Sequence, residues 1–147
     1  MNKKAGKKLF TLIVCLMMAF SMTLAAGEQD VQAASGKQIV AYAKKWVGGK
    51  YKYGGSNLKT GVDCSGFVMC VYKHFGYKLP HSSSAIAKKG RKVSYKNMKK
   101  GDVICYYGHV AIYIGNNKIV HASNKKNGIC IRKNPKYRKI RCIRRIV

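Results

Sequence analysis

The chain has 147 residues, of which 30 are Lys or Arg and four are Asp or Glu, so its net charge is +26 at pH 7. This length fits one domain and leaves no room for a second module, and we find no internal repeat or linker. A surface this basic attracts polyanions at long range, but no nucleic-acid-binding motif accompanies the charge. We therefore expect no nucleic acid partner. For an exported protein we expect anionic cell-wall polymers, bound through the basic surface of a monomer.

Residues 1–33 have the pattern of a signal peptide. A lysine-rich start precedes an almost entirely apolar stretch over 9–26. Small residues favour cleavage near Ala33, with an alternative site after Ala26; a retained membrane anchor is the other interpretation of the stretch. With cleavage near Ala33, residues 34–147 form a single catalytic domain. This domain keeps a net charge of +24, because the segment removed holds four lysines and two acids. We expect a secreted, extracellular protein.

The domain is predicted to begin with helices. A first helix over 37–47 would follow the capping residue Ser35. Residues 50–62 contain many turn formers and indicate a loop. A second helix over 64–76 has apolar residues at helical spacing, as expected for a helix in the core. A short third helix is expected over 83–89.

After Gly101 the hydrophobic period changes to two, which predicts strands separated by Gly or Asn turns. Five strands are expected, over 103–107, 109–114, 118–123, 129–133 and 140–146. Helices followed by an antiparallel meander are typical of an α+β fold. We therefore predict N-terminal helices packed on one side of an antiparallel sheet of five or more strands.

The hairpin between the second and third of these strands decides where two histidines lie. With a three-residue connection over 115–117, His109 and His121 share one face and lie diagonally across the strand pair. A two-residue connection would send them to opposite faces. The three-residue version gathers the apolar side chains on the other face, so we predict it; they are Val110, Ile112, Ile114, Val120 and Ala122.

Five cysteines remain in the domain, an odd number, which suggests one free thiol and up to two disulfides. The other four would be Cys70, Cys105, Cys130 and Cys142 if Cys64 is the free one. We favour a Cys130–Cys142 bridge, because both lie on the last two predicted strands. Secretion by an anaerobe would leave all five reduced. No pair has the spacing of a zinc site, and we expect no metal or cofactor.

Cys64 is the candidate nucleophile. Asp63 is a good helix-capping residue, which places Cys64 in the first turn of its helix. There the backbone N–H groups and a nearby imidazolium would lower the pKa of the thiol, and the same N–H groups could hold an oxyanion. One histidine of the pair can act as base and the other can orient it. The alternative is that Cys64 is only a small buried residue of the helix and that the two histidines are solvated side chains.

Several short motifs together resemble the NlpC/P60 cysteine peptidases of bacterial cell walls. They run through roughly residues 37–145: Tyr51-x-Tyr53-Gly54-Gly55, Asp63-Cys64-Ser65-Gly66-Phe67-Val68, Leu79-Pro80, Gly101-Asp102-Val103-Ile104, His109-Val110-Ala111-Ile112-Tyr113-Ile114-Gly115-Asn116 and Ile119-Val120-His121-Ala122-Ser123. The resemblance implies a papain-like fold and hydrolysis of peptidoglycan stem peptides, commonly after γ-D-glutamyl.

The resemblance also implies roles for individual residues. Cys64 corresponds to the nucleophile, His109 to the base and His121 to the orienting residue. Three further residues correspond to positions around the oxyanion and the substrate: Tyr51, Asp63 and Ser65.

The chain departs from the family in its presumed substrate cleft. The family often has Arg after Leu-Pro and Gln a few residues later, where this chain has His81 and Ile86. We assign His81 and Ser83 to the cleft as candidates.

We thus predict a secreted cysteine hydrolase of peptidoglycan stem peptides. The resemblance also implies an extracellular or wall-associated protein of a bacterium, of Gram-positive type. The alternatives are a Cys-His amidase or acyltransferase on other amides, and a non-enzymatic cationic wall-binding protein.

Overall fold

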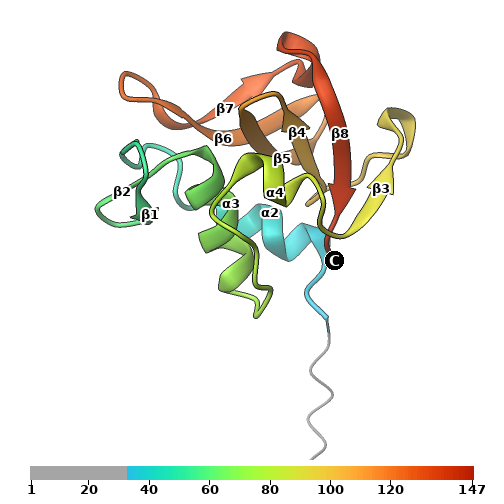
Figure 1. Ribbon diagram of the computed structural model, residues 1–147, viewed down its shortest axis with the longest axis horizontal. Coiled ribbons are helices and arrows are strands. Elements are labelled where there is room, and N and C mark those ends of the chain that lie inside the picture. The colour runs from blue at the N-terminus through green and yellow to red at the C-terminus, as the bar shows by residue number, and fades with distance from the viewer. Residues whose placement is uncertain (1–32) are drawn as a thin grey trace, which may run out of the picture. The chain divides into compact units, whose positions relative to one another are not determined.

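The computed structural model describes residues 33–147, so the predicted signal peptide lies outside the described residues. Its elements are, in chain order, α2 Gly36–Lys44, β1 Ser56–Asn57, β2 Gly61–Val62, α3 Cys64–Lys73, α4 Ser83–Ile86, β3 Arg91–Val93, η1 Tyr95–Asn97, β4 Val103–Tyr106, β5 His109–Gly115, β6 Lys118–Asn124, β7 Gly128–Lys133, η2 Pro135–Tyr137 and β8 Ile140–Arg145 (Figure 1). Over this described part, no helix is both long and apolar enough to cross a membrane.

The helices begin where side chains cap them. The Ser35 hydroxyl accepts the Gln38 N–H at the start of α2, and the Gln38 side chain accepts the Ser35 N–H in return. Asp63 caps α3 by accepting the Gly66 N–H at 2.7 Å. The predicted starts of these two helices are confirmed. The third helix is shorter than predicted: α4 ends at Ile86, and the chain then turns through Gly90 at φ 61° into β3.

The main sheet has six strands in the order β3-β8-β4-β5-β6-β7, and all its pairs are antiparallel (Figure 1). The predicted sheet of five or more strands is confirmed, and β3 is the strand that the sequence pattern missed. The expected meander is wrong for β8, which inserts between β3 and β4. All four residues of β4 are buried, so this strand needs neighbours on both sides. The last three residues of β7 are exposed, as expected for a strand at the edge of the sheet.

Apolar side chains pack on both faces of the sheet. The three helices lie together against one face, as predicted (Figure 1). The core between helices and sheet contains, among others, Ile39, Phe67, Val71, Ile86, Val110, Ile112 and Val120. A second cluster on the opposite face contains Val93, Ile104, Tyr106, Ala111, Ile119 and Ile143, with Tyr95 and Tyr137 from the short η1 and η2 turns packed against it.

The β5–β6 hairpin has the predicted register but reaches it by a different turn. Ile112 pairs with Val120 and Tyr113 with Ile119, so both histidines share one face. The turn itself is only two residues, Asn116-Asn117, both at positive φ. A register shift between Tyr113 and Gly115 adds one residue to the β5 side. This bulge restores the parity that a plain two-residue turn would have reversed.

Candidate active site

Cys64 is the first residue of α3, and Asp63 organises the backbone around it. The Asp63 carboxylate accepts the Gly66 N–H and the Gly54 N–H (3.0 Å), so it ties the 50–62 segment to the helix start. It also accepts the Ser65 hydroxyl at 3.1 Å and lies 2.8 Å from His81 Nε2. These hydrogen bonds lower the pKa of Asp63, although partial burial acts in the opposite direction. Asp63 therefore fixes the 50–62 segment relative to the start of α3.

The Cys64 thiol is half-buried against the first residues of β5. The backbone N–H of Val110, the residue after His109, and those of Ser65 and Cys64 itself act to lower the pKa of this thiol. The Tyr51 phenol lies nearby: burial raises its pKa, and Cys64 adds to that effect. Burial nevertheless dominates, and it raises the pKa of the Cys64 thiol above its ordinary value. The expected lowering of the thiol pKa is thus wrong for the free protein, because desolvation outweighs the helix start.

His109 and His121 form a buried pair. The His109 Nε2 and His121 Nδ1 atoms are 2.7 Å apart, and the side chains are about 5% and 1% exposed. Burial lowers the pKa of His109 to about 3, with His121 and Arg138 adding to the effect. Burial also lowers the pKa of His121 to about 4, assisted by Arg132 and Arg138. Both rings are therefore neutral near pH 7.

The hydrogen bond between the rings restricts where their protons lie. If His109 donates from Nε2 to His121 Nδ1, its own Nδ1 stays free to accept a proton, as a base requires. His121 then carries its proton on Nε2, a buried atom with no hydrogen-bond partner among residues 33–147. The Tyr137 hydroxyl lies 3.4 Å from His121 Nδ1, the same nitrogen that His109 Nε2 contacts. The pair can thus act as base and orienting group.

Three residues that the motifs did not single out lie beside this pair. Tyr137 packs its ring against His121, with centroids 5.8 Å apart, and its pKa is affected by Cys64. The guanidinium carbon of Arg132 is 4.3 Å from the centre of the Tyr137 ring, and that of Arg138 is 5.6 Å from it. Arg132 lies in β7, whereas Tyr137 and Arg138 lie in the segment between β7 and β8.

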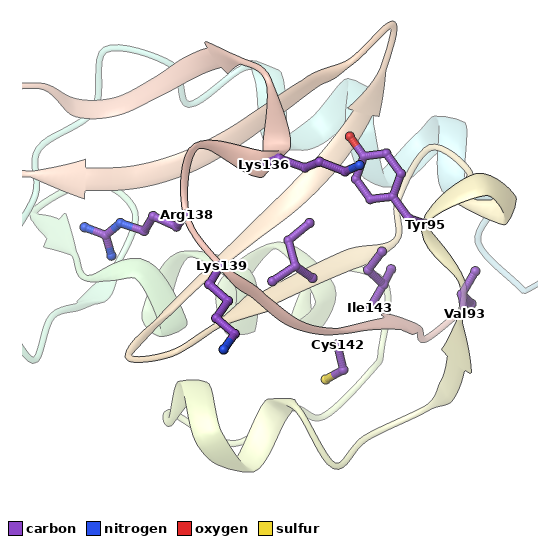
Figure 2. A pocket seen from close by; sticks show the side chains of 8 residues that line it. Val93, Tyr95, Lys136, Arg138, Lys139, Cys142 and Ile143 are labelled. Carbon is purple, nitrogen blue, oxygen red and sulfur yellow. The ribbon is translucent and has the colours of Figure 1, made fainter.

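A hollow of about 420 Å³ lies next to this cluster, at the part of β8 that β3 leaves uncovered. Its lining combines aliphatic side chains with the cations Lys136, Arg138 and Lys139 (Figure 2). Figure 2 shows Arg138 pointing away from Tyr95 and Ile143, whereas Lys136 reaches toward the Tyr95 ring. Arg138 is therefore only at the border of the hollow.

The other predicted site residues have different surroundings. Ser65 is buried and bonded to Asp63. His81 is exposed and joins the cluster through the same carboxylate. Ser83 opens α4, which is capped by the side chain of Ser82. The structure thus groups Tyr51, Asp63, Ser65 and His81 around the start of α3 and does not join Ser83 to them.

The favoured disulfide is wrong. Cys130 on β7 and Cys142 on β8 are separated in the sheet by β4, β5 and β6, and all five cysteines in the described part are free. Cys130 instead lies opposite His121, and Cys142 lies opposite Cys105. The error follows from the meander assumption, which placed the last two strands side by side.

The fold and the geometry together define a papain-like α+β domain with a cysteine at a helix start and a histidine pair on the sheet. Residues 48–144 match the sequence profile of the NlpC/P60 family. The chain belongs to this family.

Two relatives and one solved structure illustrate the similarity. The Murein DD-endopeptidase MepS/Murein LD-carboxypeptidase of Escherichia coli K12 is 41% identical over 102 residues, which are 65% of this chain and 54% of that protein. The Gamma-DL-glutamyl hydrolase of Bacillus subtilis 168 is 33% identical over 141 residues, 88% of this chain and 33% of that protein. The NlpC/p60 domain of the peptidoglycan hydrolase SagA superposes with a TM-score of 0.70 at 28% identity, over 77% of this chain and all of that domain. The chain thus spans about half or less of the length of these curated relatives.

Proposed function

We propose that this protein is a cysteine peptidase that hydrolyses amide bonds in peptidoglycan stem peptides. The observation that carries the proposal is the arrangement at the α3 start. Cys64 is the first residue of α3, the backbone N–H of Val110, directly after His109, lowers the pKa of its thiol, and His109 lies 2.7 Å from His121. Family membership and the peptidoglycan enzymes among its relatives support the choice of substrate.

The geometry supports general-base catalysis from a neutral pair. As the Cys64 sulfur attacks the amide carbonyl, its proton passes to His109 Nδ1 and the new oxyanion is held by backbone N–H groups at the helix start. His109 then gives the proton to the leaving amine as the C–N bond breaks. A water molecule attacks the thioester and His109 takes one of its protons. The C–S bond then breaks, and the departing sulfur receives that proton from His109, which restores the thiol and the neutral pair. His121 orients His109 throughout.

The bond after γ-D-glutamyl is our proposed cleavage point. The family resemblance supports it, and so does the name of the Bacillus relative. The E. coli relative carries a different designation, so bond choice varies between relatives. Mass spectrometry of the muropeptides released from purified sacculi tests the point directly: fragments ending in D-glutamate are expected, and fragments cut only at other amides would refute it.

Substitution of the thiol tests the mechanism. Cys64→Ala should lower turnover of a soluble stem peptide by about three orders of magnitude or more. Cys70→Ala is the matched control on the same helix, since its thiol donates to the Ser56 carbonyl and packs against the core, and it should keep normal turnover. Retention of most activity in Cys64→Ala would refute the mechanism. Acyl transfer to an added amine would indicate the acyltransferase alternative, and wall binding without turnover would indicate the non-enzymatic one.

We further propose that the basic surface holds the protein on anionic wall polymers. Like charges stand directly opposite one another in three cross-strand pairs, Arg91–Arg145, Lys92–Arg144 and Lys118–Lys133. Such pairs are mutually repulsive, and a bound polyanion would relieve them. Binding to isolated walls should then fall sharply at roughly 0.5 M salt. Binding that persists at this salt concentration would contradict the proposal. Binding that persists on walls stripped of anionic polymer would contradict it as well.

Secretion is proposed from the N-terminal sequence pattern. N-terminal sequencing of the protein recovered from culture medium should find a start next to Ala33. Recovery of uncleaved chain in the membrane fraction would favour the anchor instead.

A further inference from the structure

Two cysteines stand directly opposite one another in the main sheet. Cys105 on β4 and Cys142 on β8 are register partners in an antiparallel pair of strands. Residues paired in this way have Cα atoms about 4.5–5.5 Å apart and side chains on the same face of the sheet. A disulfide joins residues whose Cα atoms are about 4.4–6.8 Å apart. The backbone of these two strands therefore already has the spacing of a bridge.

The two thiols share the core between the helices and the sheet. Cys105 is fully buried, and Cys142 packs against the same core. Burial is the main cause that raises the pKa of Cys105 to about 12, and the neighbouring Cys142 thiol adds to the rise. Cys105 is thus a protonated thiol near pH 7, with a second thiol as its neighbour.

The other cysteines of the described part have no partner of this kind. Cys64 and Cys70 lie on the same helix, six residues apart, which is about 9 Å along the axis and beyond the span of a disulfide. Cys130 lies opposite His121 on the edge strand β7. Within residues 33–147, strand register therefore brings only one pair of cysteines face to face.

An oxidant can reach the pair through Cys142. This side chain is partly exposed and lines the hollow of about 420 Å³ beside β8 (Figure 2). Three cations, Lys136, Arg138 and Lys139, line the same hollow and favour an anionic reagent there. Cys105 has no exposed surface, so its thiol is oxidised only by way of its neighbour.

We propose that a small disulfide oxidant joins Cys105 to Cys142 and leaves Cys64 outside the bridge. The Cys142 sulfur attacks one sulfur of the oxidant, forms a mixed disulfide and releases the first thiol. The Cys105 sulfur then attacks Cys142, so that the protein S–S bond forms and the second thiol departs. The protons of the two cysteines end on the two released thiols. Two protein thiols are oxidised, and one small disulfide is reduced.

The bridge closes the segment 105–142, which contains both His109 and His121. It fastens β8 to β4 and so encloses the strands that carry the histidine pair. Closing so long a segment restricts the unfolded chain, so the oxidised protein should melt about 10 °C higher than the reduced one. The pairing follows from the sheet register and holds whether or not the protein is a hydrolase.

Disulfide mapping of the native protein tests the pairing. The folded, fully reduced protein would be kept with oxidised glutathione at pH 8, alkylated and digested with trypsin. Peptides 101–118 and 142–144, each with one cysteine of the pair, should be found linked, and peptide 60–73, which carries Cys64, should be linked to neither. Absence of the linked pair, or a link from 60–73 to either peptide, would overturn the proposal.

Thermal melting tests the effect of the bridge. The Cys142→Ser variant keeps a donor for the Ala87 carbonyl, which the Cys142 thiol contacts at 3.6 Å, and it should melt at the same temperature with and without the oxidant. Cys70→Ala is the matched control and should show the full rise of the native protein. A native protein that melts no higher when oxidised, or a Cys142→Ser variant that keeps the rise, would contradict the stabilising bridge. The mapping uses the native protein, so it decides the pairing even if the variant does not fold.

Discussion

Acidification should destabilise this protein because of its buried histidine pair. In the folded state the pKa values are about 3 for His109 and about 4 for His121, against 6.5 for an unperturbed histidine. Below pH 6.5 the unfolded chain therefore binds protons at both residues and the native state does not, so the free energy of unfolding falls as pH falls toward the folded values. Stability from this source is complete above about pH 7.

The magnitude follows from the same values. A pH of 5 is about 1.5 units below the pKa of an unfolded histidine, so protonation of that histidine stabilises the unfolded state by about 2 kcal/mol. The native pair stays neutral there, so the two together should lower the free energy of unfolding by roughly 4 kcal/mol between pH 8 and pH 5. The pKa of Asp63 is lowered by its hydrogen bonds, so this carboxylate contributes little over the range.

Guanidinium unfolding at pH 8, 6.5 and 5, followed by circular dichroism, measures this loss. The double variant His109→Gln/His121→Gln, compared with itself across pH, should lose less than about 1 kcal/mol. His74→Gln is the matched control, because His74 is exposed and stacked on Tyr42, and it should keep the full loss. A native protein as stable at pH 5 as at pH 8, or a double variant with the native pH slope, would refute the assignment of a neutral buried pair.

Three further substitutions test how the site is supported. Asp63→Ala removes the cap of α3 and the bond to Gly54, so thermal or chemical unfolding should show a loss of about 2 kcal/mol; an unchanged midpoint would contradict its role. Asp102→Asn leaves the Arg145 guanidinium without its buried partner and should cost about 3 kcal/mol in the same assay, whereas a loss below 1 kcal/mol would show that the pair is solvated. Asn117→Gly places glycine at a turn position with φ 55° and should raise the melting temperature by a few degrees; a lower melting temperature would contradict the turn assignment.

Much of the fold could be predicted because local signals agreed with the core. The caps at Ser35 and Asp63 and the change of period after Gly101 located the main helices and five of the six main-sheet strands. The short β1, β2 and β3 strands were missed, because two or three residues carry no detectable period. The position of β8 depends on which strand edge must be covered, and that choice depends on the burial of β4 rather than on any pattern within β8 itself.

The histidine pair shows why a correct register can follow from an incomplete turn. Apolar alternation on both strands required one extra residue in the connection. It could not distinguish a three-residue loop from an Asn116-Asn117 turn with a bulge in β5. Both solutions preserve the buried face, and packing of that face constrains the hairpin more strongly than the turn does. The side-chain placement was therefore predictable where the backbone was not.

The ionisation of the Cys64 thiol and of His109 could not be predicted from the sequence, for a common electrostatic reason. A helix start and a nearby histidine predict a reactive thiolate only if the thiol is solvent-exposed or the histidine is protonated. Here burial keeps Cys64 and His109 neutral, and Arg138 adds to the cost of protonating the histidine. With two carboxylates in the whole domain, the fold cannot supply the missing negative charge itself. The free site is thus biased against proton transfer.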